Sequence, residues 1–249
     1  HDDAVCAAPD PKQPVGFVVW VAIADVAAYV RPNSELDREA RKRGNSSYFP
    51  DRVVPMLPDR LSGDLCSLHE GVDRPVLAVE LKISAQGEKT GHRFVRGLMN
   101  SRASLSYEQA QAAFEGRPDE QSAPLAEDLG HLYKAWKATL HARAARQPLD
   151  LDLPERRIVL SDAGEVTSVA FKDRLDAHKV IEEFMVMAGP IGDFTKVLHL
   201  LQILEQKRIH AVHQKDLIGQ ILTVLRNLLL ISQCFPMCMV IMDSVSERV

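Results

Sequence analysis

The sequence is poor in cysteine and has no excess of positive charge, and each deficit excludes a class of protein. Only 4 of its 249 residues are cysteines, and their irregular spacing does not fit the disulfide framework of a small secreted domain. This favours a reducing, cytoplasmic compartment. The formal net charge of −4 gives no whole-chain sign of nucleic-acid binding, although a local basic groove can lie on an acidic protein.

The chain also lacks the patterns of a secretory signal peptide and of a membrane-spanning helix. It opens on charged residues rather than on a basic and then apolar segment. Because residue 1 is His rather than Met, we expect the chain to be a fragment. Residues 194–206 and 217–231 are leucine-rich predicted helices, but polar residues interrupt the second, which falls short of the ~18 apolar residues typical of a span. No membrane partner is expected.

What the chain does contain is a series of strand patterns. Residues 16–30 form an apolar, β-branched run typical of a buried strand and its continuation. Residues 75–84 alternate apolar and polar side chains, which predicts a half-buried strand. A Gln86-Gly87 turn follows, with residues 94–99 as the hairpin partner. A second hairpin is predicted around Asp162-Ala163-Gly164.

Helical patterns alternate with these strands. Ser34 is a suitable N-cap for a short helix that carries acids early and bases late. The predicted helices cover residues 34–42, 104–114, 125–146 and 176–188. The fold class is therefore mixed α/β (α+β), with a mixed sheet flanked by helices. We expect one domain over residues 1–188 and a helical C-terminal tail over residues 189–249.

A long loop over residues 43–68 combines an aromatic centre, Tyr48, with several prolines that exclude regular helix over residues 49–58. Six basic residues surround it: Arg38, Arg41, Lys42, Arg43, Arg52 and Arg60. An acidic pair, Asp2-Asp3, lies upstream. Together these features indicate a carboxylate-held metal beside an aromatic ring, as hydrolysis of a single-stranded phosphodiester requires. The alternatives are a solvated charged face, a solvated acidic terminus and a tyrosine that only packs.

Several collinear blocks in residues 2–187 resemble the catalytic domain (RNB domain) of the ribonuclease II and ribonuclease R family of 3′-to-5′ exoribonucleases, and are most similar to bacterial ribonuclease R. They occur in the family's order. The blocks are HDDAV, WVAIADVAAYV, LDREARKRGNSSYFPDRVVPMLPDRLSGDLCSL, the DRP of residues 73–75, SLSYEQ at 104–109 and AHKVIEEFM at 177–185.

The resemblance implies a role for each candidate residue. Asp2 and Asp3 match an adjacent aspartate pair that binds Mg²⁺ beside the scissile phosphate. Mg²⁺ is a hard cation, which suits carboxylate oxygens as ligands. Tyr48 matches an aromatic that stacks on a base near the 3′ end of the RNA. Further RNA-binding residues are assigned from the family's blocks: Arg43, Tyr107, Glu182 and Glu183. The implied reaction is Mg²⁺-assisted hydrolysis of single-stranded RNA that releases nucleoside 5′-monophosphates.

The chain also departs from the family. Two further aspartates of the acidic cluster would lie upstream of residue 1, and no Ser-Pro-Ile-Arg block follows residue 188. The cold-shock and S1 RNA-binding barrels are expected outside this chain. We therefore expect the isolated polypeptide to be weakly active or inactive. The alternative is a non-catalytic RNA-binding or assembly fragment.

Two further interpretations concern the tail. Cys234 and Cys238, with His199, His210 and His213, could hold a metal or carry a thiol function, although this is a poor zinc signature and buried free cysteines explain it as well. The leucine-rich helices could bind a partner or dimerise, or could cover an exposed core.

Overall fold

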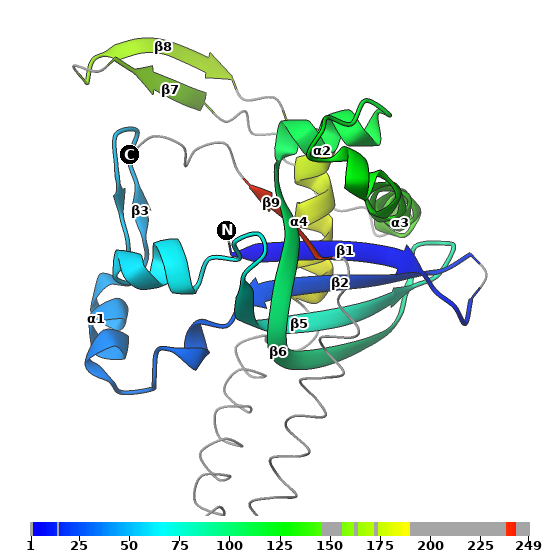
Figure 1. Cartoon of the computed structure of the whole chain (residues 1–249), viewed down its shortest axis with the longest axis horizontal. Coiled ribbons are helices and arrows are strands. Elements are labelled where there is room, and N and C mark those ends of the chain that lie inside the picture. Colours follow the sequence, from blue (N-terminus) through cyan, green and yellow to red (C-terminus); the bar gives the residue numbers. More distant parts are fainter. Residues whose placement is uncertain are drawn as a thin grey trace, which may run out of the picture.

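A closed barrel of five strands organises the computed structural model, which describes residues 2–13, 15–145, 156–161, 164–171, 174–189 and 238–242 (Figure 1). Around the barrel the order is β1 (Asp3–Pro9), β2 (Phe17–Ala24), β5 (Asp73–Ile83), β6 (Lys89–Ser106) and β9 (Cys238–Met242). Every neighbouring pair is antiparallel except β6 with β9, which is parallel. The predicted mixed sheet with helices is therefore confirmed, and its closure is new.

Three helices cover one face of the barrel sheet. They are α2 (Tyr107–Phe114), α3 (Ala126–Ala145) and α4 (Asp176–Ala188). Apolar side chains recur at helical spacing on α3, among them Leu129, Leu132 and Trp136, and these pack with strand residues such as Val5 and Leu81 into one core cluster. Burying such side chains supplies the main driving force for folding.

The opposite face of the sheet has its own core. Ala22, Val76 and Ala78 pack there against Leu61 and Leu68 from the segment that follows residue 56. The middle of β5, Val76–Val79, is buried throughout. The predicted alternation is confirmed over residues 79–83, where buried and partly exposed side chains alternate. It is wrong over residues 76–78, because the loop segment covers the face that alternation assigned to solvent.

The turn from β5 into β6 rests directly on α3. Gly87 has φ +80°, and a Cβ atom at that residue would come within 2.0 Å of the Ala138 carbonyl oxygen. Only glycine allows this approach. The predicted turn at Gln86-Gly87 is thus confirmed, while β6 is much longer than the predicted partner strand over residues 94–99.

Helix starts follow the capping residues. Ser34 caps α1 (Glu35–Arg43), where its hydroxyl accepts a hydrogen bond from the Asp37 amide at 3.2 Å. Ser106 and Gln109 form a capping box on α2, so residues 104–106 end β6 rather than begin the helix. The bounds predicted for α4 are confirmed.

The remaining elements are short. β3 (Ser47–Tyr48) and β4 (Val53–Val54) form one hairpin, and β7 (Arg156–Leu160) and β8 (Val166–Phe171) form the second predicted hairpin. A π-helical segment, η2 (Arg60–Leu65), follows β4, and short 3₁₀ turns lie at Val26–Ala28 and Ala123–Leu125. The proline-rich loop therefore contains a small hairpin, and regular α-helix is absent from residues 49–58 as predicted.

Strand β9 was missed by the sequence analysis. It lies in the region predicted as a helical tail, yet it pairs with both β1 and β6 and closes the barrel. The two leucine-rich helices predicted at residues 194–206 and 217–231 lie outside the described residues, and the division at residue 188 remains a prediction. In the described part of the chain, no helix has both the length and the hydropathy needed to span a bilayer.

Candidate functional site

The acidic pair lies where the barrel begins. Asp3 is the first residue of β1 and is paired with Ile23, and the Ala24 amide donates a hydrogen bond to the Asp2 carbonyl at 2.9 Å. Asp2 is exposed and Asp3 is half-buried. Asp2 precedes β1, so the alternation of side chains along the strand does not fix the direction of its carboxylate, and its charge acts on Asp3.

The electrostatics of this pair favour a bound cation. Burial, reinforced by the neighbouring charge of Asp2, raises the pKa of Asp3. A bound cation would relieve that repulsion, and Mg²⁺ characteristically uses only one or two carboxylates together with phosphate and water. The pair fits that donor set. Within the described residues no group of three His, Cys, Asp or Glu side chains converges on one point, so this part of the chain supplies at most a partial metal site.

A buried carboxylate lies close by in the fold and was missed from the sequence. Asp25 follows β2 and is only 2% exposed. Its amide donates to the Pro75 carbonyl at 2.9 Å and its Oδ2 accepts from Nε of Arg96. Its Oδ1 is buried and has no hydrogen-bond partner among the residues that the structure describes. No local pattern distinguishes Asp25 within the apolar run over residues 16–30, because its partner Arg96 lies far along the chain.

Cys66 lies at the end of η2, within electrostatic reach of Asp2 and Asp25. Burial raises the pKa of the Cys66 thiol, the charges of Asp2 and Asp25 raise it further, and Arg74 opposes them. Arg74 also binds this segment directly, donating from Nε to the Ser67 carbonyl at 3.0 Å and from a terminal nitrogen to Asp64 at 2.7 Å. Asp2, Asp25, Cys66 and Arg74 therefore share one region of the molecule.

Tyr48 lies on the β3–β4 hairpin and is the most exposed large hydrophobic residue among those described, at 75%. The hairpin and α1 project on the side of the barrel where β1 begins (Figure 1). Tyr48 therefore does not pack into the core, and the interpretation of Tyr48 as a packing residue is wrong.

Arg43 connects α1 to this hairpin. Its Nε donates to Glu39 at 2.9 Å and its terminal nitrogen donates to the Pro55 carbonyl at 3.1 Å. Other bases of α1 also have acidic partners one turn away, such as Arg41 with Asp37 at 3.1 Å. The structure gives Arg43 a positioning role, and its assignment to RNA remains a prediction.

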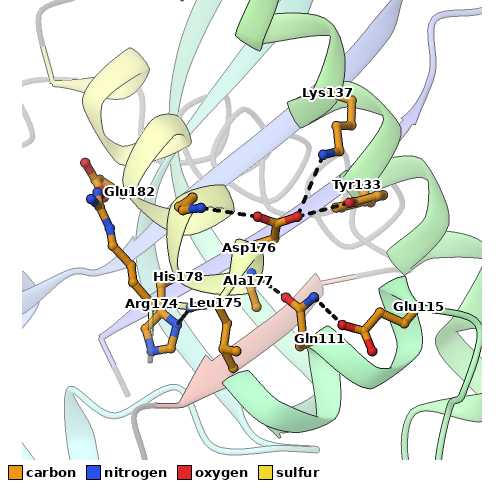
Figure 2. Close-up of polar contacts among 11 residues, drawn as sticks. Gln111, Glu115, Tyr133, Lys137, Arg174, Leu175, Asp176, Ala177, His178 and Glu182 are labelled. Carbon is orange, nitrogen blue, oxygen red and sulfur yellow. Dashed lines mark hydrogen bonds and ion pairs between the residues drawn. The ribbon is translucent and has the colours of Figure 1, made fainter. Parts of the chain in front are cut away.

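Tyr107 lies at a different place, the junction of α2 and α4. Its ring stacks on the imidazole of His178 with centroids 3.9 Å apart. Nδ1 of His178 accepts a hydrogen bond from the Leu175 amide at 3.2 Å and so caps the start of α4 (Figure 2). Tyr107 is half-buried, and its observed contact is within the protein.

The two adjacent glutamates of α4 have different environments. Glu182 is exposed and bonded to Arg174 at 2.5 Å (Figure 2). Glu183 is 1% exposed and bonded to Arg143 of α3 at 2.7 Å. Successive helix residues point about 100° apart, so the two carboxylates do not act as a pair. The burial of Glu183 favours a structural role, and direct RNA contact by either residue stays a prediction.

Polar contacts fix α4 between its neighbours at the same junction. Asp176 accepts from the Tyr133 hydroxyl at 3.1 Å and lies 3.7 Å from Nζ of Lys137, both on α3. Gln111 of α2 accepts from the Ala177 amide at 3.1 Å. Figure 2 shows these side chains converging on the first turn of α4. The network joins three helices, which indicates a scaffold.

Comparison with known proteins confirms the resemblance read from the sequence blocks. The family model "RNB domain" matches residues 1–232. Ribonuclease R of Escherichia coli (strain K12) is 41% identical over 190 residues, which is 76% of this chain and 23% of the relative. Mycoplasma genitalium RNase R in complex with ribose methylated single-stranded RNA has a TM-score of 0.70 and 32% identity, over 75% of this chain and 29% of that one.

The fold alone does not decide activity. Yeast Ssd1, described as a pseudonuclease, has a TM-score of 0.54 with 19% identity to this chain. The chain moreover spans about a quarter of the length of the relatives it matches. The catalytic question therefore depends on the residues of the site.

Proposed function

Because the chain belongs to the RNB domain family, we propose that it is the core of a 3′-to-5′ exoribonuclease that hydrolyses single-stranded RNA with the help of Mg²⁺. The observation that carries the proposal is the acidic pair Asp2-Asp3 at the start of β1, on the side of the barrel where the β3–β4 hairpin projects (Figure 1). That hairpin carries the exposed Tyr48. The products are nucleoside 5′-monophosphates.

Asp2 and Asp3 hold the cation in this proposal. Mg²⁺ bound there would supply activation of a water molecule and stabilisation of charge on the phosphate. The residues themselves contribute position, because the Asp2 backbone is fixed to β2 through the Ala24 amide. Burial, and after it the charge of Asp2, raises the pKa of Asp3, and a bound cation would offset the repulsion between the two carboxylates.

Tyr48 provides the base contact. Stacking of a base on an aromatic ring is worth about 1–3 kcal/mol and tolerates any base, which suits a nuclease that removes nucleotides regardless of sequence. Arg43 supports the hairpin through Pro55 and adds positive charge near the RNA. Tyr107, Glu182 and Glu183 are proposed to shape the substrate channel through the α2–α4 junction.

The compartment and the wider assembly follow the same proposal. We place the protein in the cytoplasm, and we assign additional RNA-binding domains to the part of the relatives' length that this chain does not span.

The 249-residue polypeptide by itself should be weakly active or inactive. The test is incubation with 5′-labelled single-stranded RNA and Mg²⁺, with EDTA in the control, while calorimetry follows Mg²⁺ binding to the wild type and to Asp2→Asn/Asp3→Asn. Robust stepwise shortening from the 3′ end would overturn the weak activity and support the nuclease. Mg²⁺ binding that the double variant leaves unchanged would overturn the proposed metal ligands.

The second candidate is a non-catalytic RNA-binding fragment. The observation in its favour is that, among the described residues, no group of three His, Cys, Asp or Glu side chains is placed to hold a metal ion. Retention of RNA in EDTA with no cleavage in Mg²⁺ supports this reading, and cleavage at any measurable rate that requires Mg²⁺ contradicts it.

A further inference from the structure

The β3–β4 hairpin places an unusual amount of apolar surface in solvent. Tyr48 is 75% exposed, Phe49 49%, Val53 49% and Val54 43%. These residues belong to an eight-residue segment, 47–54, whose two strands pair with each other and with no other strand in the described part of the chain. Exposed apolar side chains gathered on one small protrusion indicate a binding surface.

The hairpin is held in a defined position despite its size. The Phe49 amide donates to the Arg52 carbonyl at 2.8 Å and closes the turn. At its base, the Met56 amide donates to the Ser46 hydroxyl at 2.9 Å, and Arg43 binds the Pro55 carbonyl. An isolated two-stranded hairpin is marginally stable, so these contacts pre-position the exposed side chains before any partner arrives.

Phe49 has a cation on its ring. The Arg52 guanidinium carbon lies 5.4 Å from the ring centroid, and the same guanidinium donates to Asp51 at 2.7 Å, which fixes its orientation. An aromatic ring with a guanidinium over one face offers its other face for stacking beside a positive charge. Nucleobases and their phosphates are the partners that use both features.

Charge in this region does not by itself select the partner. Residues 35–64 contain six Lys and Arg and six Asp and Glu, and Arg38, Arg41 and Arg43 are paired with carboxylates of α1. The choice of RNA therefore rests on the Phe49 ring, the Arg52 guanidinium over it and the proposed function.

We propose that Phe49 and Arg52 form a second stacking platform beside Tyr48, so that the hairpin engages two neighbouring nucleotides of one RNA strand. The inference rests on the proposed function, because it takes single-stranded RNA as the ligand. It assigns a binding role to Phe49 and Arg52 that Tyr48 alone does not account for.

The experiment measures binding of a fluorescent single-stranded RNA by anisotropy, in EDTA so that no cleavage occurs. Phe49→Ala should weaken binding roughly 5- to 150-fold, the equivalent of one lost base stack, and Phe49→Trp should restore it. Val54→Ala, on the same hairpin and exposed to a similar degree, is the matched control and should change binding less than about 2-fold. Circular dichroism confirms that each variant is folded.

RNAs with single abasic sites identify the two nucleotides. The loss caused by Phe49→Ala should disappear for one abasic position, and the loss caused by Tyr48→Ala for the adjacent one. If Tyr48→Ala weakens binding while Phe49→Ala behaves like Val54→Ala, the platform is overturned and the proposed function stands. If the wild type binds no RNA, both the stacking platform and the proposed function are overturned. If Phe49→Ala instead lowers self-association in sedimentation, the hairpin is a contact between copies and the platform is overturned.

Discussion

Charged side chains of this domain contribute very differently depending on what surrounds them, and Glu182 and Glu183 provide the contrast. Glu182 and its partner Arg174 are both substantially solvent-accessible, so solvent screens their attraction. Glu183 lies in the core beside Phe184 and reaches Arg143 across the α3–α4 interface. Removal of one partner from such a pair leaves a buried charge without compensation.

Substitution of Glu183 by Gln should therefore destabilise the domain strongly. We expect a loss of about 2 kcal/mol in the free energy of unfolding, because the half-buried guanidinium of Arg143 would lose its counter-charge and a charge-assisted hydrogen bond. Glu182→Gln, one residue earlier, is the matched control and should cost less than about 1 kcal/mol. Urea denaturation of both variants measures the difference. Equal losses would show that the core position of Glu183 does not matter.

Sequence reasoning reached single residues only where local chemistry or family blocks identified them. Ser34 was accessible because a cap bonds within the first turn of its own helix. The helix that Ser106 caps was predicted to begin at residue 104, which is too early. Asp25 was not, because its burial and its pairing with Arg96 depend on strands that meet only in the folded chain. The Asp2-Asp3 pair acquired meaning through the resemblance, since two acids near a terminus carry little information alone.

At the scale of elements, a carboxylate in the loop between α2 and α3 holds that loop to α2 through hydrogen bonds. Asp119 accepts from the Ser122 hydroxyl at 2.6 Å, from the Ser122 amide at 2.8 Å and from Gln109 of α2 at 2.7 Å. These bonds favour the charged carboxylate, with Ser122 dominant, and hold the pKa of Asp119 below its ordinary value. Gln109 also belongs to the capping box of α2, so its hydrogen bond to Asp119 supports the start of that helix.

This lowered pKa makes a pH-dependent prediction. Because the folded state binds the proton less readily than the unfolded state, the stabilisation by Asp119 is present above its ordinary pKa and is lost as pH falls through the lower folded value. Asp119→Asn should therefore lower the melting temperature at pH 7, and the deficit should shrink toward pH 2. Glu120→Gln is the neighbouring control. A deficit that stays constant with pH would contradict the assignment.

Elements were predictable in proportion to how local their determinants are. The bounds of α4 follow from helical periodicity within thirteen residues. Strand β9 is a short apolar run after a leucine-rich segment, and periodicity alone cannot distinguish such a run from part of a buried helix. Its strand conformation depends on partners at the other end of the sequence.

At the scale of the whole molecule, β9 determines whether the barrel has free edges. It pairs antiparallel with β1 through Ala4 and Val5, and parallel with β6 through residues 101–106. β1 and β6 each have one other neighbour, β2 and β5 respectively. Without β9, both strands would present unpaired amides and carbonyls to solvent, and such edges template association with other chains.

Truncation before β9 should therefore destabilise the domain and promote aggregation. A variant that ends at residue 237 should melt at a lower temperature and scatter more light on incubation than wild type, since two strand edges open at once. A variant that ends at residue 242 keeps the strand and is the matched control. Val240→Pro gives an independent check at full length, because proline removes a backbone donor from the ladder that β9 shares with its neighbours. If both truncations melt and scatter alike, β9 does not close the barrel in solution.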